Sequence, residues 1–207
     1  MVEIIECLQN STDWYEARRG LVTASEFSTI MANGRGGGES VTRKKYLYRL
    51  AGEIVTGELA ETYNNPIMDR GHAMEGEARD AYAFMKDVDP VLVGFVRNGR
   101  VGASPDSFIG DNGILELKTK QPSVLIETLF RDGFPPEHRA QCQGLLYVCE
   151  REFVDLAAYW PRMPLYVCRA YRDEEYIKTI ADAAAKFNDE LDALVERVRS
   201  YGRRDAA

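Results

Sequence analysis

The sequence predicts a mixed α/β fold in which a mostly antiparallel central sheet is flanked by helices. Segments with apolar residues at helical spacing come first, and short strands joined by turn residues follow. A helix, two further strands and a long helix close the chain, an order typical of a sheet covered by helices. Because no Pro-, Gly- or Ser-rich linker divides the sequence, we interpret residues 1–207 as one domain.

Helical spacing and capping residues predict the elements of the first half. Thr23 and Glu26 have the spacing of a capping box, so a helix should begin there and end near Asn33-Gly34. Asn65-Pro66 is a favourable helix start, with Asn as the cap and Pro in the first turn. The other elements expected in this half are a glycine-rich loop and two amphipathic helices, at 34–38, 42–57 and 65–86.

Alternating apolar patterns and turn residues predict the second half. Asn98-Gly99 and Asp111-Asn112-Gly113 have the composition of hairpin turns. The expected strands are 91–97, 100–103, 107–109, 114–118, 153–160 and 165–171, and the expected helices are 123–131, 137–149 and 173–199.

Composition argues against several classes of protein. The sequence contains no run of about 18 apolar residues, so it predicts no membrane-spanning helix. The N-terminus lacks a basic leader, and we therefore expect a cytosolic protein. The four cysteines form no Cys-x-x-Cys pair, which argues against a zinc site. The net charge of −7 argues against a uniformly basic nucleic-acid surface. Acidic metal ligands count toward that charge, however, and a basic channel can be local.

The strongest local signal is Ser104-Pro105-Asp106 followed by Glu116-Leu117-Lys118. Side chains two positions apart in a strand share a face, so Glu116 and Lys118 should point the same way. A hairpin between the two segments would bring Asp106 beside Glu116. The pattern therefore predicts two carboxylates and an ammonium group at one end of a sheet.

Such a group has the chemistry of a magnesium site. Mg²⁺ binds through one or two carboxylates and keeps several waters, so Asp106 and Glu116 are candidate ligands, with the Leu117 carbonyl as a further oxygen. Lys118 would lie beside the metal, where it could orient or deprotonate a water or neutralise charge on a phosphate. The alternative is a solvated strand face, on which Glu-x-Lys is common.

This Asp…Glu-x-Lys pattern resembles the PD-(D/E)xK nuclease superfamily, and further segments resemble its lambda-exonuclease/YqaJ viral recombinase family. They occur in the order and spacing of that family, which makes the set more specific than any one motif. The segments are WYEARRGLVTAS (14–25), GHAMEGEA (71–78), GASPD (102–106), LELK (115–118), AQCQ (140–143) and YWPRM (159–163).

The resemblance implies a restriction-endonuclease-like core with a metal site. Asp106, Glu116 and the Leu117 carbonyl would bind Mg²⁺, with two ions expected and Mn²⁺ able to substitute. Glu75 would complete the site through water or at a second ion, and Lys118 would be the catalytic lysine. The alternative for Glu75 is an exposed ion pair with Arg79, one helical turn away.

The resemblance also implies a pocket for a 5′-terminal phosphate. Arg18 and Ser25 would form it, and Ser104 and Gln141 would assist there or at the catalytic centre. Ser25 falls in the first turn of the capped helix expected above, where free backbone N–H groups favour an anion. The alternatives are a solvated face for Arg18 and a helix surface for Gln141, with Gln143 the candidate if the register slips.

Two further residues are candidate DNA contacts. Arg35 lies in the glycine-rich loop, where a basic tip could enter a DNA groove. Met68 precedes Glu75 by two helical turns and could act as an apolar wedge between terminal base pairs. The alternative for Met68 is an ordinary core methionine.

The activity that the resemblance implies is Mg²⁺-dependent 5′→3′ exonuclease digestion of double-stranded DNA from its ends. Such an enzyme releases mononucleotides and leaves 3′ single-stranded tails. In that family it serves phage or prophage recombination in the bacterial cytoplasm, beside a single-strand annealing protein, as a homotrimeric ring around DNA. Two alternatives remain open: an endonuclease or junction resolvase on the same core, and a DNA-binding module without activity. The phosphate pocket favours an end-dependent enzyme, and the intact Asp106, Glu116 and Lys118 argue against an inactive module.

Overall fold

The computed structural model describes residues 1–34, 36, 38, 40–60 and 66–202, with only the backbone described for 66–73. Asn65, the expected cap, lies outside the described residues. The elements in chain order are β1 (Val2–Ile5), α1 (Thr12–Arg18), β2 (Val22–Thr23), the 3₁₀ turn η1 (Ala24–Glu26), α2 (Phe27–Met31), α3 (Val41–Thr56), α4 (Pro66–Lys86), β3 (Phe95–Asn98), β4 (Val101–Ala103), β5 (Ser107–Ile109), β6 (Gly113–Thr119), α5 (Pro122–Leu129), α6 (Pro136–Cys149), β7 (Phe153–Tyr159), β8 (Tyr166–Tyr171) and α7 (Glu174–Arg199).

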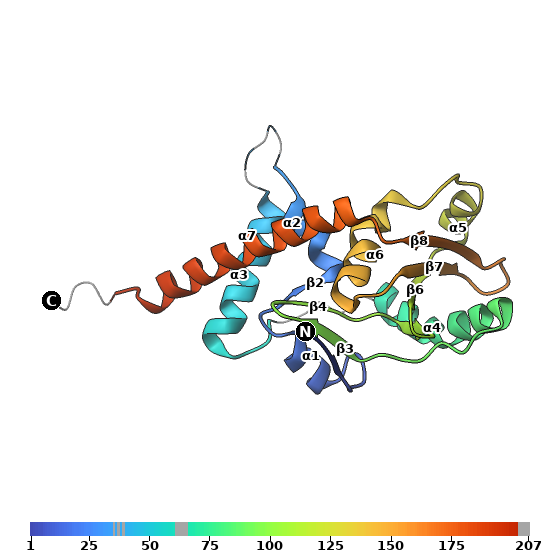
Figure 1. Ribbon diagram of the computed structural model, residues 1–207, viewed down its shortest axis with the longest axis horizontal. Helices are drawn as coiled ribbons and strands as arrows, with labels where there is room; N and C mark the ends of the chain where they lie inside the picture. The colour runs from blue at the N-terminus through green and yellow to red at the C-terminus, as the bar shows by residue number, and fades with distance from the viewer. Residues whose placement is uncertain (35, 37, 39, 61–65, 203–207) are drawn as a thin grey trace.

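Within the described residues the strands form two four-stranded sheets, in the orders β1-β3-β4-β2 and β5-β6-β7-β8 (Figure 1). Each sheet has one parallel pair, β2–β4 or β6–β7, and its other pairs are antiparallel. The predicted mixed α/β class is confirmed, but the strands divide into two sheets. The division falls at the link 104–106 between β4 and β5, where Pro105 has no N–H to donate to a ladder.

Helices cover both faces of the second sheet. On one face Ile114 of β6 and Leu156 of β7 are fully buried in the large core, which also includes α2, α3, α6 and α7. On the other face Leu115 and Leu117 pack with Tyr82 of α4 in a smaller core. Successive residues of β6 therefore alternate between α6 and α4, as the strand period requires.

A buried charge network fixes α4 to the second sheet. The Tyr82 hydroxyl donates to Asp155 Oδ2 of β7 at 2.5 Å, and Arg169 of β8 donates two hydrogen bonds to the same carboxylate at 2.7 and 2.8 Å. Burial raises the pKa of Asp155, but the hydrogen bonds from Arg169 and Tyr82 outweigh it and leave this pKa below its usual value. The carboxylate is thus stabilised in its charged form and links one helix to two strands.

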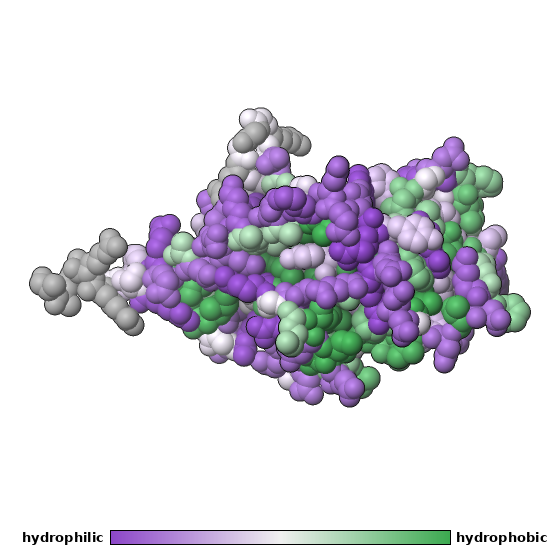
Figure 2. Space-filling model, viewed as in Figure 1, coloured by the Kyte–Doolittle hydropathy of each residue, from purple (hydrophilic) through white to green (hydrophobic). Residues whose placement is uncertain are grey.

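The surface reflects the amphipathic pattern of the helices. Figure 2 shows a hydrophilic outer face along α7, with apolar atoms gathered around β1 and β3. In the part of the chain with described coordinates, no helix is both long and apolar enough to cross a bilayer.

Two expectations about local structure were wrong, and one strand was missed. The strand expected at 91–97 is shorter and shifted, because Val91 makes only an isolated bridge to Phe108 and β3 begins at Phe95. At Gly94 a side chain would lie 2.5 Å from the Cys7 carbonyl oxygen, so the N-terminal segment passes close to this loop. The strand β1 was not predicted; it pairs with β3. Finally, Thr23 makes no side-chain cap, and a 3₁₀ turn precedes a helix of only five residues.

Candidate active site

The hairpin β5–β6 brings Asp106 beside β6. Strand β5 pairs with β6 only from Ser107↔Leu115 to Ile109↔Gly113, so the rest of β6 extends beyond the end of β5. Asp106 precedes β5 and fills this gap, since its Oδ2 accepts a hydrogen bond from the Leu117 N–H at 2.5 Å. In a strand the N–H and C=O of one residue face the same neighbour, so the Leu117 carbonyl also faces the side of Asp106.

Glu116 is the most buried member of the group. Its side chain is 3% exposed, and Oε1 accepts hydrogen bonds from Lys118 Nζ and Gln141 Nε2, both at 2.6 Å. The other oxygen, Oε2, is buried and has no hydrogen-bond partner in the described part of the protein. An unpartnered charged oxygen is costly in the interior, so this atom is suited to a cation.

The electrostatics of the group also favour a cation. Burial and the neighbouring Glu116 raise the pKa of Asp106 well above its ordinary value, against the opposing effects of the Leu117 N–H and Lys118. Burial lowers the pKa of Lys118, but the Glu116 carboxylate outweighs burial and raises it overall. Lys118 is therefore an ammonium ion, and the two carboxylates remain an incompletely neutralised pair.

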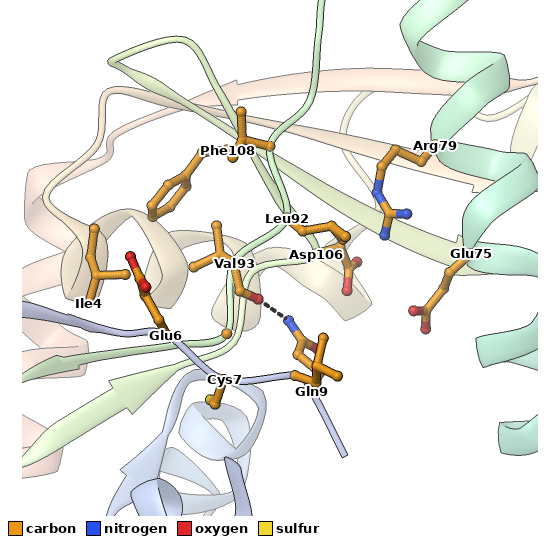
Figure 3. A pocket seen from close by; sticks show the side chains of 13 residues that line it. Ile4, Glu6, Cys7, Gln9, Glu75, Arg79, Leu92, Val93, Asp106 and Phe108 are labelled. Carbon is orange, nitrogen blue, oxygen red and sulfur yellow. Dashed lines mark hydrogen bonds between the residues drawn. The ribbon is translucent and has the colours of Figure 1, made fainter. Parts of the chain in front are cut away.

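Glu75 approaches Asp106 from the face of the sheet opposite to that of Glu116. It lies on α4, which covers the face of the sheet that Leu117 occupies, whereas Glu116 hydrogen-bonds to Gln141 of α6. Figure 3 shows Glu75 and Asp106 directed into one pocket. Among the described residues no three His, Cys, Asp or Glu side chains are close enough to form a metal cluster. Asp106 and Glu116 nevertheless fit Mg²⁺, which needs only one or two carboxylates beside water and substrate oxygens.

Two of the residues expected to bind a terminal phosphate, Arg18 and Ser104, lie beside Trp14. The Arg18 guanidinium stacks on the Trp14 ring at 4.0 Å, and Trp14 Nε1 donates to Ser104 Oγ at 2.8 Å. Burial lowers the pKa of Arg18, and no ion pair joins it to a carboxylate in the described structure. Gln141, in contrast, hydrogen-bonds to Glu116.

Ser25 does not have the environment that the sequence predicted. It lies in the three-residue turn η1, and its hydroxyl lies 3.3 Å from the Thr23 hydroxyl. Because neither η1 nor the short α2 provides an extended helix dipole, the argument from a helix N-terminus does not apply here. A phosphate-binding role for Ser25 therefore depends on its hydroxyl and on the resemblance.

The two candidate DNA contacts cannot be placed. Arg35 lies outside the described residues. Met68 belongs to the backbone of α4, but its side chain is also outside what the structure describes.

The YqaJ-like viral recombinase domain model matches residues 13–152, about two thirds of the chain. The chain belongs to this family. Among curated protein sequences, none matches significantly.

Solved structures extend the comparison to nearly the whole chain. The chain is similar to the alkaline exonuclease LHK-Exo of Laribacter hongkongensis, with 27% identity and a TM-score of 0.83 over 95% of this chain and 100% of that one. LHK-Exo in complex with dAMP gives 28% identity and a TM-score of 0.85, with the same coverage. A phage-related exonuclease from Haemophilus somnus 129PT shares the fold, at 14% identity and a TM-score of 0.66, over 86% of this chain and 96% of that one. Family membership and the likeness to LHK-Exo support a nuclease function.

Two residues that bond to the segments beside Asp106 were not among the predicted site residues. Gln9 Nε2 donates to the carbonyl oxygens of Val93 and Pro105, at 2.8 and 2.9 Å. Trp14 is a core residue, 7% exposed, and its indole N–H also donates to Ser104 Oγ. Both hold the turn that carries Asp106. The polar groups of these two side chains indicated that each needs a hydrogen-bond partner. No sequence pattern indicated which residues those partners are.

Proposed function

We propose that this YqaJ-family chain is a Mg²⁺-dependent 5′→3′ exonuclease that digests double-stranded DNA from its ends, releasing mononucleotides and leaving 3′ single-stranded tails. The observation that carries the proposal is the buried Oε2 of Glu116, which has no hydrogen-bond partner among the described residues and lies beside the Asp106 carboxylate. Two such carboxylates suit a divalent cation, and a lysine lies next to them.

Each side chain has a definite part in hydrolysis. Asp106 and Glu116 would hold the cation, with the Leu117 carbonyl facing the same side and Glu75 acting through water or at a second ion. A bound divalent cation supplies Lewis-acid polarisation of the phosphodiester and lowers the pKa of a coordinated water. The Lys118 ammonium donates hydrogen bonds to the attacking water or to a phosphate oxygen. Gln141 holds Glu116 Oε1 and thereby sets the orientation of the carboxylate.

The choice of an exonuclease over an endonuclease is supported by the group around Trp14. Arg18 is a partly buried cation stacked on an aromatic ring, and Ser104 lies beside that ring. Only an enzyme that starts from an end needs a site for a terminal phosphate, so this group favours an exonuclease over an endonuclease or a resolvase. The alkaline exonuclease of Laribacter hongkongensis is similar over its whole length, which supports the same class of activity.

The wider setting follows from the family resemblance. We expect a homotrimeric ring around DNA, a single-strand annealing protein as partner, and a role in phage or prophage recombination in the bacterial cytoplasm. A ring could gather basic side chains toward its channel although the chain carries a net charge of −7.

A digestion assay tests the activity. Linear duplex is labelled separately at each terminus and incubated with and without Mg²⁺ and with and without a 5′ phosphate. We expect Mg²⁺-dependent release of mononucleotides from 5′ ends. Closed circular duplex should remain intact. Cleavage of circular duplex would instead establish an endonuclease, and release from 3′ ends would reverse the polarity.

Replacing Arg18 tests the terminal phosphate site separately. Arg18→Ala should remove the preference for 5′-phosphorylated over 5′-hydroxyl ends, because it deletes the cation and leaves the catalytic group in place. Arg19→Ala, at a neighbouring residue paired with Glu16, is the control and should keep the preference. An unchanged preference in Arg18→Ala would place the phosphate elsewhere.

A further inference from the structure

A cavity of about 600 Å³ adjoins Asp106 on the side of α4. It lies between the N-terminal segment 4–9, the loop 91–94 and α4 (Figure 3). Its volume falls within the range of about 300–1,000 Å³ that is usual for small-molecule sites. Neither Glu116 nor the residues around Trp14 line it, so it is distinct from the expected site for a terminal phosphate.

Among its described lining residues, the cavity has one cationic group beside several acidic ones. Arg79 is the only basic residue of that described lining, and Glu75, Asp106 and Glu6 are acidic. The Arg79 guanidinium points toward Asp106 and Glu75 (Figure 3). An anion that entered the cavity would therefore be drawn to this one side chain.

The structure holds Arg79 in place without using up its donors. Its Nε donates to Ser107 Oγ at 2.9 Å, and Ser107 is fully buried next to Asp106. In the described structure neither of the two terminal nitrogens of the guanidinium makes a hydrogen bond or an ion pair. A guanidinium with its terminal N–H groups free is suited to two parallel hydrogen bonds with a phosphate.

Part of the cavity lining is apolar and exposed. Leu8, Val91 and Leu92 are 78%, 60% and 65% exposed, although all three are large apolar residues that line one cavity. Such a grouping marks a surface that is covered during function. A sugar and base lying on this wall would remove it from water, and a phosphate attached to them would reach toward Arg79.

We propose that this cavity is a nucleotide subsite for the cleaved strand, in which Arg79 binds a phosphate and the wall of Leu8, Val91 and Leu92 packs against the nucleoside. The inference rests on the proposed exonuclease function and deepens it. Two observations single out a nucleotide: the one guanidinium of the described lining, which matches one phosphate, and the continuity of the cavity with the catalytic Asp106. The subsite would fix one nucleotide relative to Asp106, so its loss should weaken binding of both the strand and a released mononucleotide.

The test compares Arg79→Met and Leu92→Asp with two controls on the exposed end of α7, Arg197→Met and Val198→Asp. For each protein the KM for linear duplex is measured, together with inhibition by dCMP, deoxycytidine and inorganic phosphate. A lost charged hydrogen bond corresponds to about tenfold or more in affinity, so Arg79→Met should raise the KM and the dCMP inhibition constant by that factor. Leu92→Asp should weaken inhibition by dCMP more than inhibition by phosphate, because the new charge repels both anions and only dCMP also loses an apolar contact. Arg79→Lys, which keeps the charge, should recover part of the loss.

Three outcomes would overturn the subsite. In the first, Arg79→Met and Leu92→Asp match their controls within a factor of two, both in KM and in the dCMP inhibition constant. Phosphate alone could inhibit as strongly as dCMP, so that the wall holds no nucleoside. Inhibition by deoxycytidine alone, unchanged in Arg79→Met, would exclude the phosphate contact. A wild-type protein that digests no linear duplex would contradict the exonuclease function instead, and calorimetric titration with dCMP would then test the cavity independently.

Discussion

At the scale of single residues, the candidate active site carries charge that the fold does not neutralise. Burial and Glu116 raise the pKa of Asp106 above its value in an unfolded chain. A group with a raised pKa adds to the free energy of unfolding, and this contribution is complete when the pH is below the pKa of the unfolded chain. The contribution is lost as the pH rises through the pKa of the folded protein. Without a cation, the folded protein is therefore less stable at neutral or alkaline pH than it would be without this charge.

Asp106→Asn should make the metal-free protein more stable and inactive. The amide oxygen can still accept the Leu117 N–H, while the repulsion from Glu116 disappears. In EDTA at pH 8 we expect a gain of about 1 kcal/mol, or roughly 2–4 °C in Tm, which shrinks as the pH is lowered toward 4. Hydrolysis should fall by a factor on the order of 10³.

Asp192→Asn is the matched control for this change. Arg100 holds the pKa of Asp192 below its usual value, so this carboxylate stabilises the fold and its removal should bring no gain. A lower Tm for Asp106→Asn than for wild type at pH 8, or retained hydrolysis, would contradict the assigned role.

The positions of Asp106, Glu116 and Lys118 could be predicted because they depend on local geometry. Two of them are two positions apart in one strand, and a short hairpin connects the third. The hydrogen bond from Gln9 to Pro105 joins residues 96 positions apart, and no spacing rule reaches that far. The local patterns therefore located the carboxylates but not the side chains that hold their turn.

At the scale of elements, the site depends on how closely α6 packs on η1 and α2. A side chain at Gly144 of α6 would lie 2.3 Å from the Phe27 ring and 3.4 Å from the Ala24 Cβ. This contact sets the distance between the helix that carries Gln141 and the turn that carries Ser25. Only glycine permits it, because any larger residue must displace Phe27.

Gly144→Ala should therefore destabilise the protein and weaken substrate binding. Forcing a methyl group into a close-packed contact costs about 1–3 kcal/mol, which would lower the Tm by roughly 2–12 °C. The shift of α6 should also raise the KM for 5′-phosphorylated duplex more than it lowers kcat. Thermal unfolding and steady-state digestion measure the two effects.

Gly52→Ala is the control, because Gly52 lies in α3 with nothing within 4 Å of an added methyl group. Alanine has the higher helix propensity, so this change should leave the KM unchanged and raise stability by about 0.5–1 kcal/mol. Equal effects of the two substitutions would show that the close contact of α6 has no role in the site.

Element boundaries could be predicted where turns and caps are local, and not where partners are distant. The strand β5 and the turn at Asp111-Asn112-Gly113 follow the expectation. The helix expected after Thr23 is interrupted, because its residues pack against α6 and the Thr23 hydroxyl pairs with Ser25 instead of capping. The strand β1 needs β3 as a partner, and its own sequence did not show that pairing.

At the scale of the whole molecule, binding of a cation should appear as stability. A ligand that binds only the folded state stabilises it by about 2.7 kcal/mol when its concentration is 100 times its Kd. Asp106 immediately precedes β5 and Glu116 lies on the paired strand β6, so a cation between them should stabilise this sheet as a unit. Mg²⁺ should therefore raise the Tm of wild type by roughly 5–10 °C at that concentration.

Glu116→Gln should abolish most of this shift, because it removes the charged oxygen that has no partner in the described structure. Glu150→Gln, at an exposed residue bonded to Asn98, should keep the shift of wild type. The titration uses no DNA, so it separates cation binding from turnover. Because non-specific screening by Mg²⁺ would act on all three proteins alike, equal shifts in all three would exclude Glu116 as a ligand, whereas a shift lost only in Glu116→Gln would place the cation at the carboxylate pair.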